Sequence, residues 1–95
     1  MQTKDVHYSD YLQLEKILNA QQLESDLNDA HAHDEMLFII IHQSYELWFK
    51  QIMYEIESIA EIMGQGIIND NSPDLQTVVH RLNRIVVILR IAVHK

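Results

Sequence analysis

A row of apolar residues at spacings of three and four runs through the middle of the sequence. Its members are Leu37, Ile41, Trp48, Ile52, Ile56, Ile59 and Met63. At about 100° per residue, they fall on one side of an α-helix. Because a helix with one apolar side buries that side against other elements, the row predicts a long core helix over about residues 34–63.

Helix-breaking residues are scarce, since the 95-residue chain contains only two glycines and one proline. Turns and loops need such residues, so their scarcity favours an all-α fold. We expect a helical bundle in which the long central helix is flanked by a short N-terminal helix over about residues 9–20 and a C-terminal helix over about residues 73–93.

Capping residues and loop composition support these helix boundaries. Ser9 or Asp10 can cap the first helix, and Ser72 followed by Pro73 is a strong helix start, because proline at the first helical position needs no N–H group. The segment of residues 21–33 is acidic and lacks periodicity. We expect this segment to be a connecting loop.

The predicted helices carry more apolar surface than three helices can bury. Leu47 and Tyr54 lie opposite the main row, and residues 85–93 are apolar nearly all round except at Arg90. A second row on the last helix comprises Leu75, Val78, Val79, Leu82, Ile85, Val86 and Leu89. Large exposed apolar patches mark interaction surfaces. We expect residues 1–95 to form a single helical unit that is the N-terminal fragment of a longer, oligomeric domain.

The charge balance argues against several kinds of partner. The formal net charge is −7, with 14 acidic and seven basic residues, so nucleic acid and anionic membranes are poor partners. The absence of cysteine excludes disulfides, iron–sulfur clusters, thiolate zinc sites and covalent haem attachment. The longest apolar run, Met36 to Ile41, is too short to span a bilayer. We expect a cytoplasmic protein.

His42 interrupts the apolar block of the central helix, one turn after Phe38. With Phe49 and Met53, these residues form a second strip beside the main row. One interpretation is a histidine at the edge of a core. The other is a polar group beside an aromatic wall, which is typical of small-molecule sites. Periodicity does not decide between them.

Two further groups of residues invite a functional interpretation. Tyr8 and Tyr11 either pack with wet hydroxyl groups or line a pocket or an interface. His31, His33 and Asp34 suggest a metal site, but we rank this hypothesis last because a histidine pair with one carboxylate lacks a third well-placed ligand and is easily a solvated loop.

Several separated segments resemble one known family. They are Tyr8-Ser9-Asp10-Tyr11-Leu12, Leu18-Asn19-Ala20-Gln21, His33-Asp34-Glu35, Leu37-Phe38-Ile39-Ile40, His42-Gln43, Glu46-Leu47-Trp48-Phe49-Lys50 and His80-Arg81-Leu82-Asn83-Arg84-Ile85. In this order, the segments resemble the N-terminal portion of the tryptophan 2,3-dioxygenase family, and the resemblance covers nearly all of residues 7–93.

The resemblance implies an all-helical homotetramer with non-covalent haem b. Such an enzyme inserts both atoms of O₂ across the C2–C3 bond of the indole of L-tryptophan and forms N-formylkynurenine, the first step of the kynurenine route. It implies that Phe38 packs on the indole above the distal haem face and that His42 accepts a hydrogen bond from the indole N–H. Whether His42 also removes the proton stays open.

The same resemblance extends the substrate wall to Ile39, Ile40 and Ile41. It also implies that Tyr8, Tyr11 and Leu12 reach into the pocket of a neighbouring subunit.

Other groups of the family's site match no position in this chain. The resemblance places the haem-ligating histidine, the arginine for the substrate carboxylate and the threonine near the substrate ammonium beyond residue 95. His80 and His94 are not assigned as iron ligands, so we expect no metal ligand among these residues. We expect the chain alone to bind no haem tightly and to be inactive. The alternative is a helical oligomerisation or interaction module without a catalytic role.

Overall fold

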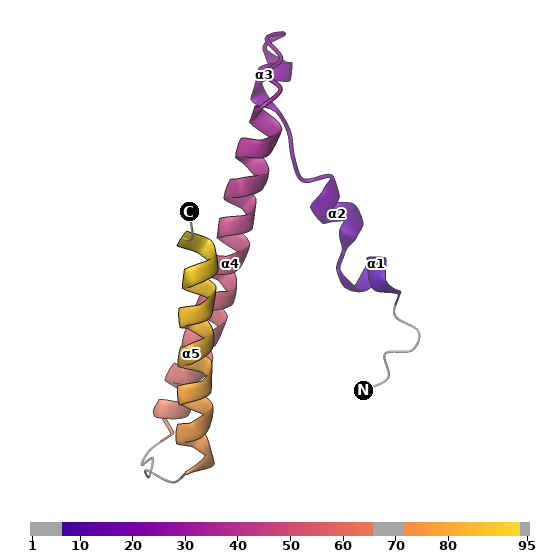
Figure 1. The fold of residues 1–95 in the computed structure, drawn as a ribbon. Coiled ribbons are helices and arrows are strands. Elements are labelled where there is room, and N and C mark those ends of the chain that lie inside the picture. Colours follow the sequence, from indigo (N-terminus) through magenta and orange to yellow (C-terminus); the bar gives the residue numbers. More distant parts are fainter. Residues whose placement is uncertain (1–6, 66–71, 94–95) are drawn as a thin grey trace. The chain divides into compact units, whose positions relative to one another are not determined.

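The computed structural model describes residues 7–65 and 72–93, and every regular element in these ranges is an α-helix (Figure 1). The helices are α1 (Tyr8–Tyr11), α2 (Leu14–Leu18), α3 (Glu24–Leu27), α4 (Glu35–Met63) and α5 (Pro73–Val93). The all-α prediction is confirmed. None of the helices in the described ranges has the length and hydropathy needed to cross a membrane.

The chain divides into two compact units, Met1–Ile41 and His42–Lys95. The division falls within α4, whose first turns belong to the first unit and whose remaining turns belong to the second. The predicted long helix over residues 34–63 is confirmed, because α4 covers Glu35–Met63 without interruption.

The predicted helix over residues 9–20 is wrong as a continuous element. It is broken between α1 and α2 at Gln13, whose φ of 52° is left-handed. From this conformation the Gln13 carbonyl oxygen accepts hydrogen bonds from the amides of Lys16 and Ile17 at 3.0 and 3.1 Å. The residue that precedes α1 is His7, and no side chain caps either short helix. The predicted caps at Ser9 or Asp10 are therefore also wrong.

The segment of residues 21–33 is not entirely a loop. It contains the one-turn helix α3, Glu24–Leu27, followed by a turn in which Asp29 has a φ of 55°. The amide of Ala30 donates to the carbonyl oxygen of Ser25 at 2.9 Å and closes this turn. Side-chain contacts hold the segment in place, which is why the absence of apolar periodicity did not reveal it.

α5 begins where the sequence predicts. Pro73 is its first residue, and the Ser72 hydroxyl oxygen accepts a hydrogen bond from the amide of Leu75 at 3.1 Å. This contact satisfies one of the N–H groups that a helix leaves unpaired at its start. The predicted cap and the predicted range of residues 73–93 are confirmed.

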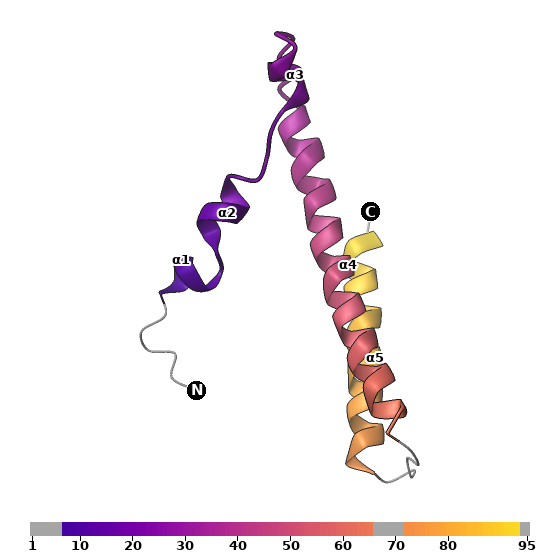
Figure 2. The same ribbon diagram turned by 180° about the vertical axis from the view of Figure 1, so that it is seen from behind.

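Within the second unit, α5 lies alongside α4, and the two helices form a hairpin (Figure 2). The buried residues of this hairpin are Val78, Ile88 and Ala92 of α5 and Glu55 of α4. On α4, Ile52, Ile59 and Ile62 are half-buried. The packed sides are therefore lined by residues of moderate size around one carboxylate.

The predicted apolar rows coincide only partly with these packed sides. In the α4 row, Ile52 and Ile59 are half-buried, whereas the other members are exposed: Leu37, Ile41, Trp48, Ile56 and Met63. In the α5 row, Val78 is buried and Leu75 and Ile85 are half-buried, whereas Val79, Leu82, Val86 and Leu89 are exposed. Each helix thus buries the residues along only one edge of its apolar row, because a single partner helix covers only part of a wide apolar side.

Glu55 is the charged residue of this packed surface and is only 3% exposed. Its Oε2 atom accepts hydrogen bonds from Nη1 of Arg84 at 2.8 Å and from Nε2 of Gln51 at 2.7 Å. The Arg84 hydrogen bond is the main reason that the pKa of Glu55 lies below its usual value of 4.5. Because an unpaired buried charge is strongly unfavourable, this contact specifies which residues of α4 and α5 face each other.

Replacing Ser72 with alanine should weaken the start of α5. Loss of the hydroxyl acceptor leaves the Leu75 amide without its partner, and the free energy of unfolding should fall by about 1 kcal/mol. Urea denaturation followed by circular dichroism measures this change. Ser72→Asp is the matched control, because aspartate is an equally good cap. Equal stability of the alanine variant and the wild-type chain would contradict the capping role.

The Glu55–Arg84 contact should make the hairpin sensitive to acid. Since folding lowers the pKa of Glu55 from 4.5, the contact stabilises the folded state above that value, and the stabilisation is lost as the pH falls through the lowered pKa. The urea midpoint of the wild-type chain should therefore drop on acidification below pH 4.5.

Arg84→Met should lower the midpoint at neutral pH and flatten its dependence on pH. Arg90→Met, which removes an exposed arginine of the same helix, should leave the acid-induced drop intact. An unchanged acid profile in Arg84→Met would show that the contact does not stabilise the hairpin.

Candidate functional site

The strip predicted from the sequence lies on α4 and is accessible in this chain. Phe38 is 62% exposed, and the side chains of His42, Phe49 and Met53 are also exposed. Phe38 belongs to the first compact unit and His42 opens the second. Both are residues of one continuous helix and are separated by one turn.

A row of aromatic contacts begins at His42 in the second unit. The His42 and Tyr45 rings meet edge to face, with centroids 6.4 Å apart and planes at 77°. The Tyr45 ring in turn stacks against Phe49, with centroids 6.4 Å apart and planes at 24°. These separations are within the range in which ring pairs attract each other. The imidazole is therefore the first member of a row of three rings.

The sequence interpretation missed Tyr45. Its spacing of three from His42 and four from Phe49 is the signal that could have found it, because residues at these spacings are neighbours on a helix. At about 100° per residue, the positions of His42, Tyr45 and Phe49 lie within about 60° around the helix axis. The part of α4 in the second unit therefore presents an aromatic wall, which we define by these three residues.

The isoleucines next to Phe38 are distributed around α4. Ile39 is half-buried, and Ile40 and Ile41 are exposed. Because consecutive helical residues are about 100° apart, the three isoleucines project from α4 in three different directions. The structure does not bring all three isoleucines to one surface.

The other residues predicted for the site lie at the start of the chain. Tyr8 and Tyr11 belong to α1, and their side chains are 74% and 68% exposed. Leu12 follows α1, is half-buried, and donates its amide to the carbonyl oxygen of Tyr8 at 3.0 Å. Both tyrosine side chains are thus accessible to another chain, and their role in a substrate pocket stays a prediction.

The remaining histidines have separate surroundings. Nδ1 of His31 lies 2.6 Å from Oδ1 of Asp26, and both side chains are more than half exposed. His80 is exposed on α5, and His94 lies outside the described residues. Across residues 7–65 and 72–93, no three histidine, aspartate or glutamate side chains gather as metal ligands would. His31, one of the three residues in the metal hypothesis that we ranked last, is thus paired with Asp26.

The fold and the aromatic wall together define a class. This is an all-α protein in which one long helix displays a row of rings that begins with an imidazole and pairs with a second helix in a hairpin that leaves apolar surface uncovered.

Comparison with known proteins identifies the family within this class. The profile of the family described as tryptophan 2,3-dioxygenase matches residues 1–95. The chain is 52% identical over 88 residues to a tryptophan 2,3-dioxygenase of Rattus norvegicus. It is 49% identical over 85 residues to one of Alteromonas mediterranea. This chain belongs to the tryptophan 2,3-dioxygenase family.

The two relatives are much longer than this chain. The matched residues make up 93% of this chain but 21% of the Rattus norvegicus protein, and 90% of this chain but 23% of the Alteromonas mediterranea protein. The chain thus spans about a fifth of the length of the curated relatives it matches. The family resemblance drawn from the sequence segments is confirmed over this part.

Proposed function

We propose that this chain supplies the substrate-facing wall of a tryptophan 2,3-dioxygenase. The complete enzyme oxidises L-tryptophan with O₂ to N-formylkynurenine, the first step of tryptophan catabolism by the kynurenine route. The proposal rests on membership of the family and on one structural observation, the exposed aromatic wall of α4.

The chemistry of the wall suits an indole substrate. An indole is a flat aromatic ring system with one N–H donor, so it needs aromatic contacts and one hydrogen-bond acceptor. Phe38 offers a ring face one turn from His42, and a neutral His42 has one nitrogen that can accept a hydrogen bond. The edge contact with Tyr45 restrains the His42 ring. We assign Phe38 to indole packing and His42 to the indole N–H.

The proposed cofactor is non-covalent haem b, which supplies the iron that activates O₂ when bound. The wall fits one face of such a group, because its exposed side chains are apolar or aromatic and a porphyrin is a flat apolar ring. We propose that the residue that would hold the iron belongs to the part of the family sequence that this chain does not match, so His42 would not bind iron. His42 acts on the substrate, as a hydrogen-bond acceptor or as a proton acceptor.

The proposed enzyme is a cytoplasmic homotetramer with a shared site. Tyr8 and Tyr11 lie exposed on α1, and we propose that they and Leu12 enter the substrate pocket of a neighbouring subunit. Such an exchange would make the oligomer necessary for activity.

A second candidate function is a helical interaction module without catalysis. The observation that favours it is the exposed apolar side of α5, formed by Val79, Leu82, Val86, Leu89 and Val93. In such a module His42 would be an ordinary surface histidine, and its replacement would not alter any reaction.

Replacing His42 separates these functions. The chain is joined to the remaining part of the Rattus norvegicus relative, and kcat/KM for L-tryptophan is measured. His42→Ala should lower it by about two- to tenfold if His42 only accepts a hydrogen bond, and by about a hundredfold or more if it also removes the proton. His80→Ala, which removes an exposed histidine of α5, should have no effect.

A substrate lacking the indole N–H sharpens this test. With wild-type His42, methylation of the indole nitrogen should lower kcat/KM, and the penalty should shrink in His42→Ala because the hydrogen bond is already lost. If His42→Ala turns over both substrates as the wild type does, the interaction-module function is favoured.

Adding hemin to the 95-residue chain tests the location of the iron ligand. We expect no sharp absorption band of histidine-ligated haem, since a haem enzyme needs its axial ligand to hold the iron. The titration is followed by absorbance, with the joined full-length protein as the positive control. A sharp band that disappears on replacing one of the six histidines would place a ligand in this chain and contradict the proposal.

A further inference from the structure

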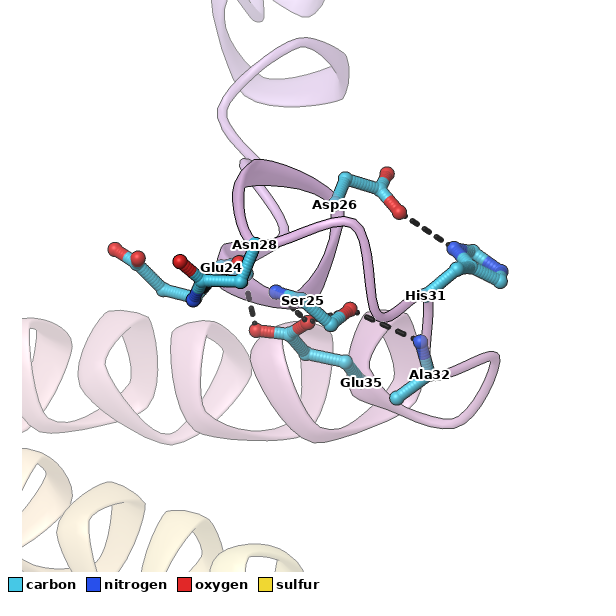
Figure 3. A network of polar contacts seen from close by, with 7 residues as sticks. All are labelled: Glu24, Ser25, Asp26, Asn28, His31, Ala32 and Glu35. Carbon is cyan, nitrogen blue, oxygen red and sulfur yellow. Dashed lines mark hydrogen bonds and ion pairs between the residues drawn. The ribbon is translucent and has the colours of Figure 1, made fainter.

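A closed network of hydrogen bonds connects α3 to the first residue of α4 (Figure 3). Its centre is the Glu35 carboxylate. Oε2 of Glu35 accepts the amide of Glu24 at 2.9 Å, and Oε1 accepts the amide and the hydroxyl of Ser25 at 3.0 and 2.6 Å. Three donors from α3 thus converge on one side chain of α4.

The Glu35 carboxylate takes the place of an N-cap side chain for α3. Leu23, which precedes α3, has no side-chain acceptor, so the first amides of α3 would lack partners without Glu35. The Ser25 hydroxyl donates to Glu35 and accepts the amide of Ala32 at 3.0 Å, so both its donor and its acceptor capacity are used. The hydrogen bonds from Ser25 are the leading reasons that the pKa of Glu35 lies below its usual value. The carboxylate is therefore held in its charged form.

The network lies at the first turn of α4, which leads directly to Phe38. Glu35 is the first residue of α4, and the amide of Phe38 donates to the carbonyl oxygen of Asp34 at 3.2 Å. Phe38 thus belongs to the helical turn that Glu35 opens. The backbone position of Phe38 therefore depends on that of Asp34 and Glu35.

We propose that Glu35 is a positioning residue for substrate binding: by fastening α3 to the first turn of α4, it sets the place and orientation of Phe38. This inference rests on the proposed function, since it assumes that Phe38 packs on the indole. Neither Glu35 nor Ser25 touches the substrate in this proposal. The two residues act through the helix that carries Phe38.

The consequence is a specific kinetic signature. A contact that Phe38 makes equally with substrate and transition state contributes to KM and not to kcat. Loosening the start of α4 should therefore raise KM for L-tryptophan by about three- to tenfold with little change in kcat, because one weakened apolar contact changes affinity by that order. A merely structural role would change stability or expression without this separation.

The test uses the joined full-length protein with five variants. Glu35→Ala removes all three acceptor contacts, and Glu35→Gln keeps the size of the side chain but not its charge. Ser25→Ala removes the hydroxyl contacts. Ser25→Thr keeps a hydroxyl, so its KM should equal that of the wild type. Glu57→Gln is the matched control, because Glu57 is an exposed glutamate further along α4.

Two measurements are made on each variant. Hydrogen exchange followed by mass spectrometry reports whether residues 24–35 open, and steady-state kinetics reports KM and kcat. We expect faster exchange and a raised KM together in Glu35→Ala, Glu35→Gln and Ser25→Ala, and neither change in Ser25→Thr or Glu57→Gln. If Glu35→Ala does not fold, Glu35→Gln and the Ser25 pair still decide the outcome.

The possible failures are distinct. Faster exchange with unchanged KM would overturn the positioning role and leave the proposed function standing, because the wild-type protein still turns over tryptophan. Unchanged exchange would show that the network does not hold the segment, which also overturns the inference. If the wild-type protein itself fails to oxidise tryptophan, the proposed function fails first and the positioning role falls with it.

Discussion

The second unit depends on the pairing of one carboxylate that is removed from water. Glu55 lies within the packed surface of α4 and α5 and receives hydrogen bonds from Arg84 and Gln51. In the described part of the chain, no buried side-chain oxygen or nitrogen lacks a partner. Apolar side chains could pack in several registers, but a buried charge is tolerated only where its partner is within reach. This contact therefore selects one register of the hairpin.

The large exposed apolar surface follows from the same pairing of α4 and α5. The two helices meet through narrow sides, which on α5 contain Val78, Ile88 and Ala92, and many apolar residues on the remaining sides stay exposed. These include the rings of Phe38, Tyr45 and Phe49 as well as the outer side of α5. Exposed apolar surface of this extent is typical of a segment that contacts further protein or a ligand.

Helix type and helix limits were predictable where local signals were strong. The 3,4 spacing over residues 37–63 predicted α4, and Ser72 with Pro73 predicted the start of α5. The break at Gln13 was not predictable, because nothing in a glutamine favours a left-handed backbone. α3 was missed because the side chain of Glu35, ten residues later than Ser25, satisfies its first amides. Contacts at that separation leave no periodic trace in the sequence.

For the site, the sequence by itself determined the residue types and their spacing along one helix. Phe38 and His42 had to lie one turn apart on α4, because helix geometry depends only on position in the chain. Which apolar side each helix buries, the pairing of Glu55 with Arg84, and the ring contacts of Tyr45 were decided only by the tertiary structure. Each of these depends on how two side chains or two helices approach each other, and a helical row wider than one contact surface offers several equivalent choices.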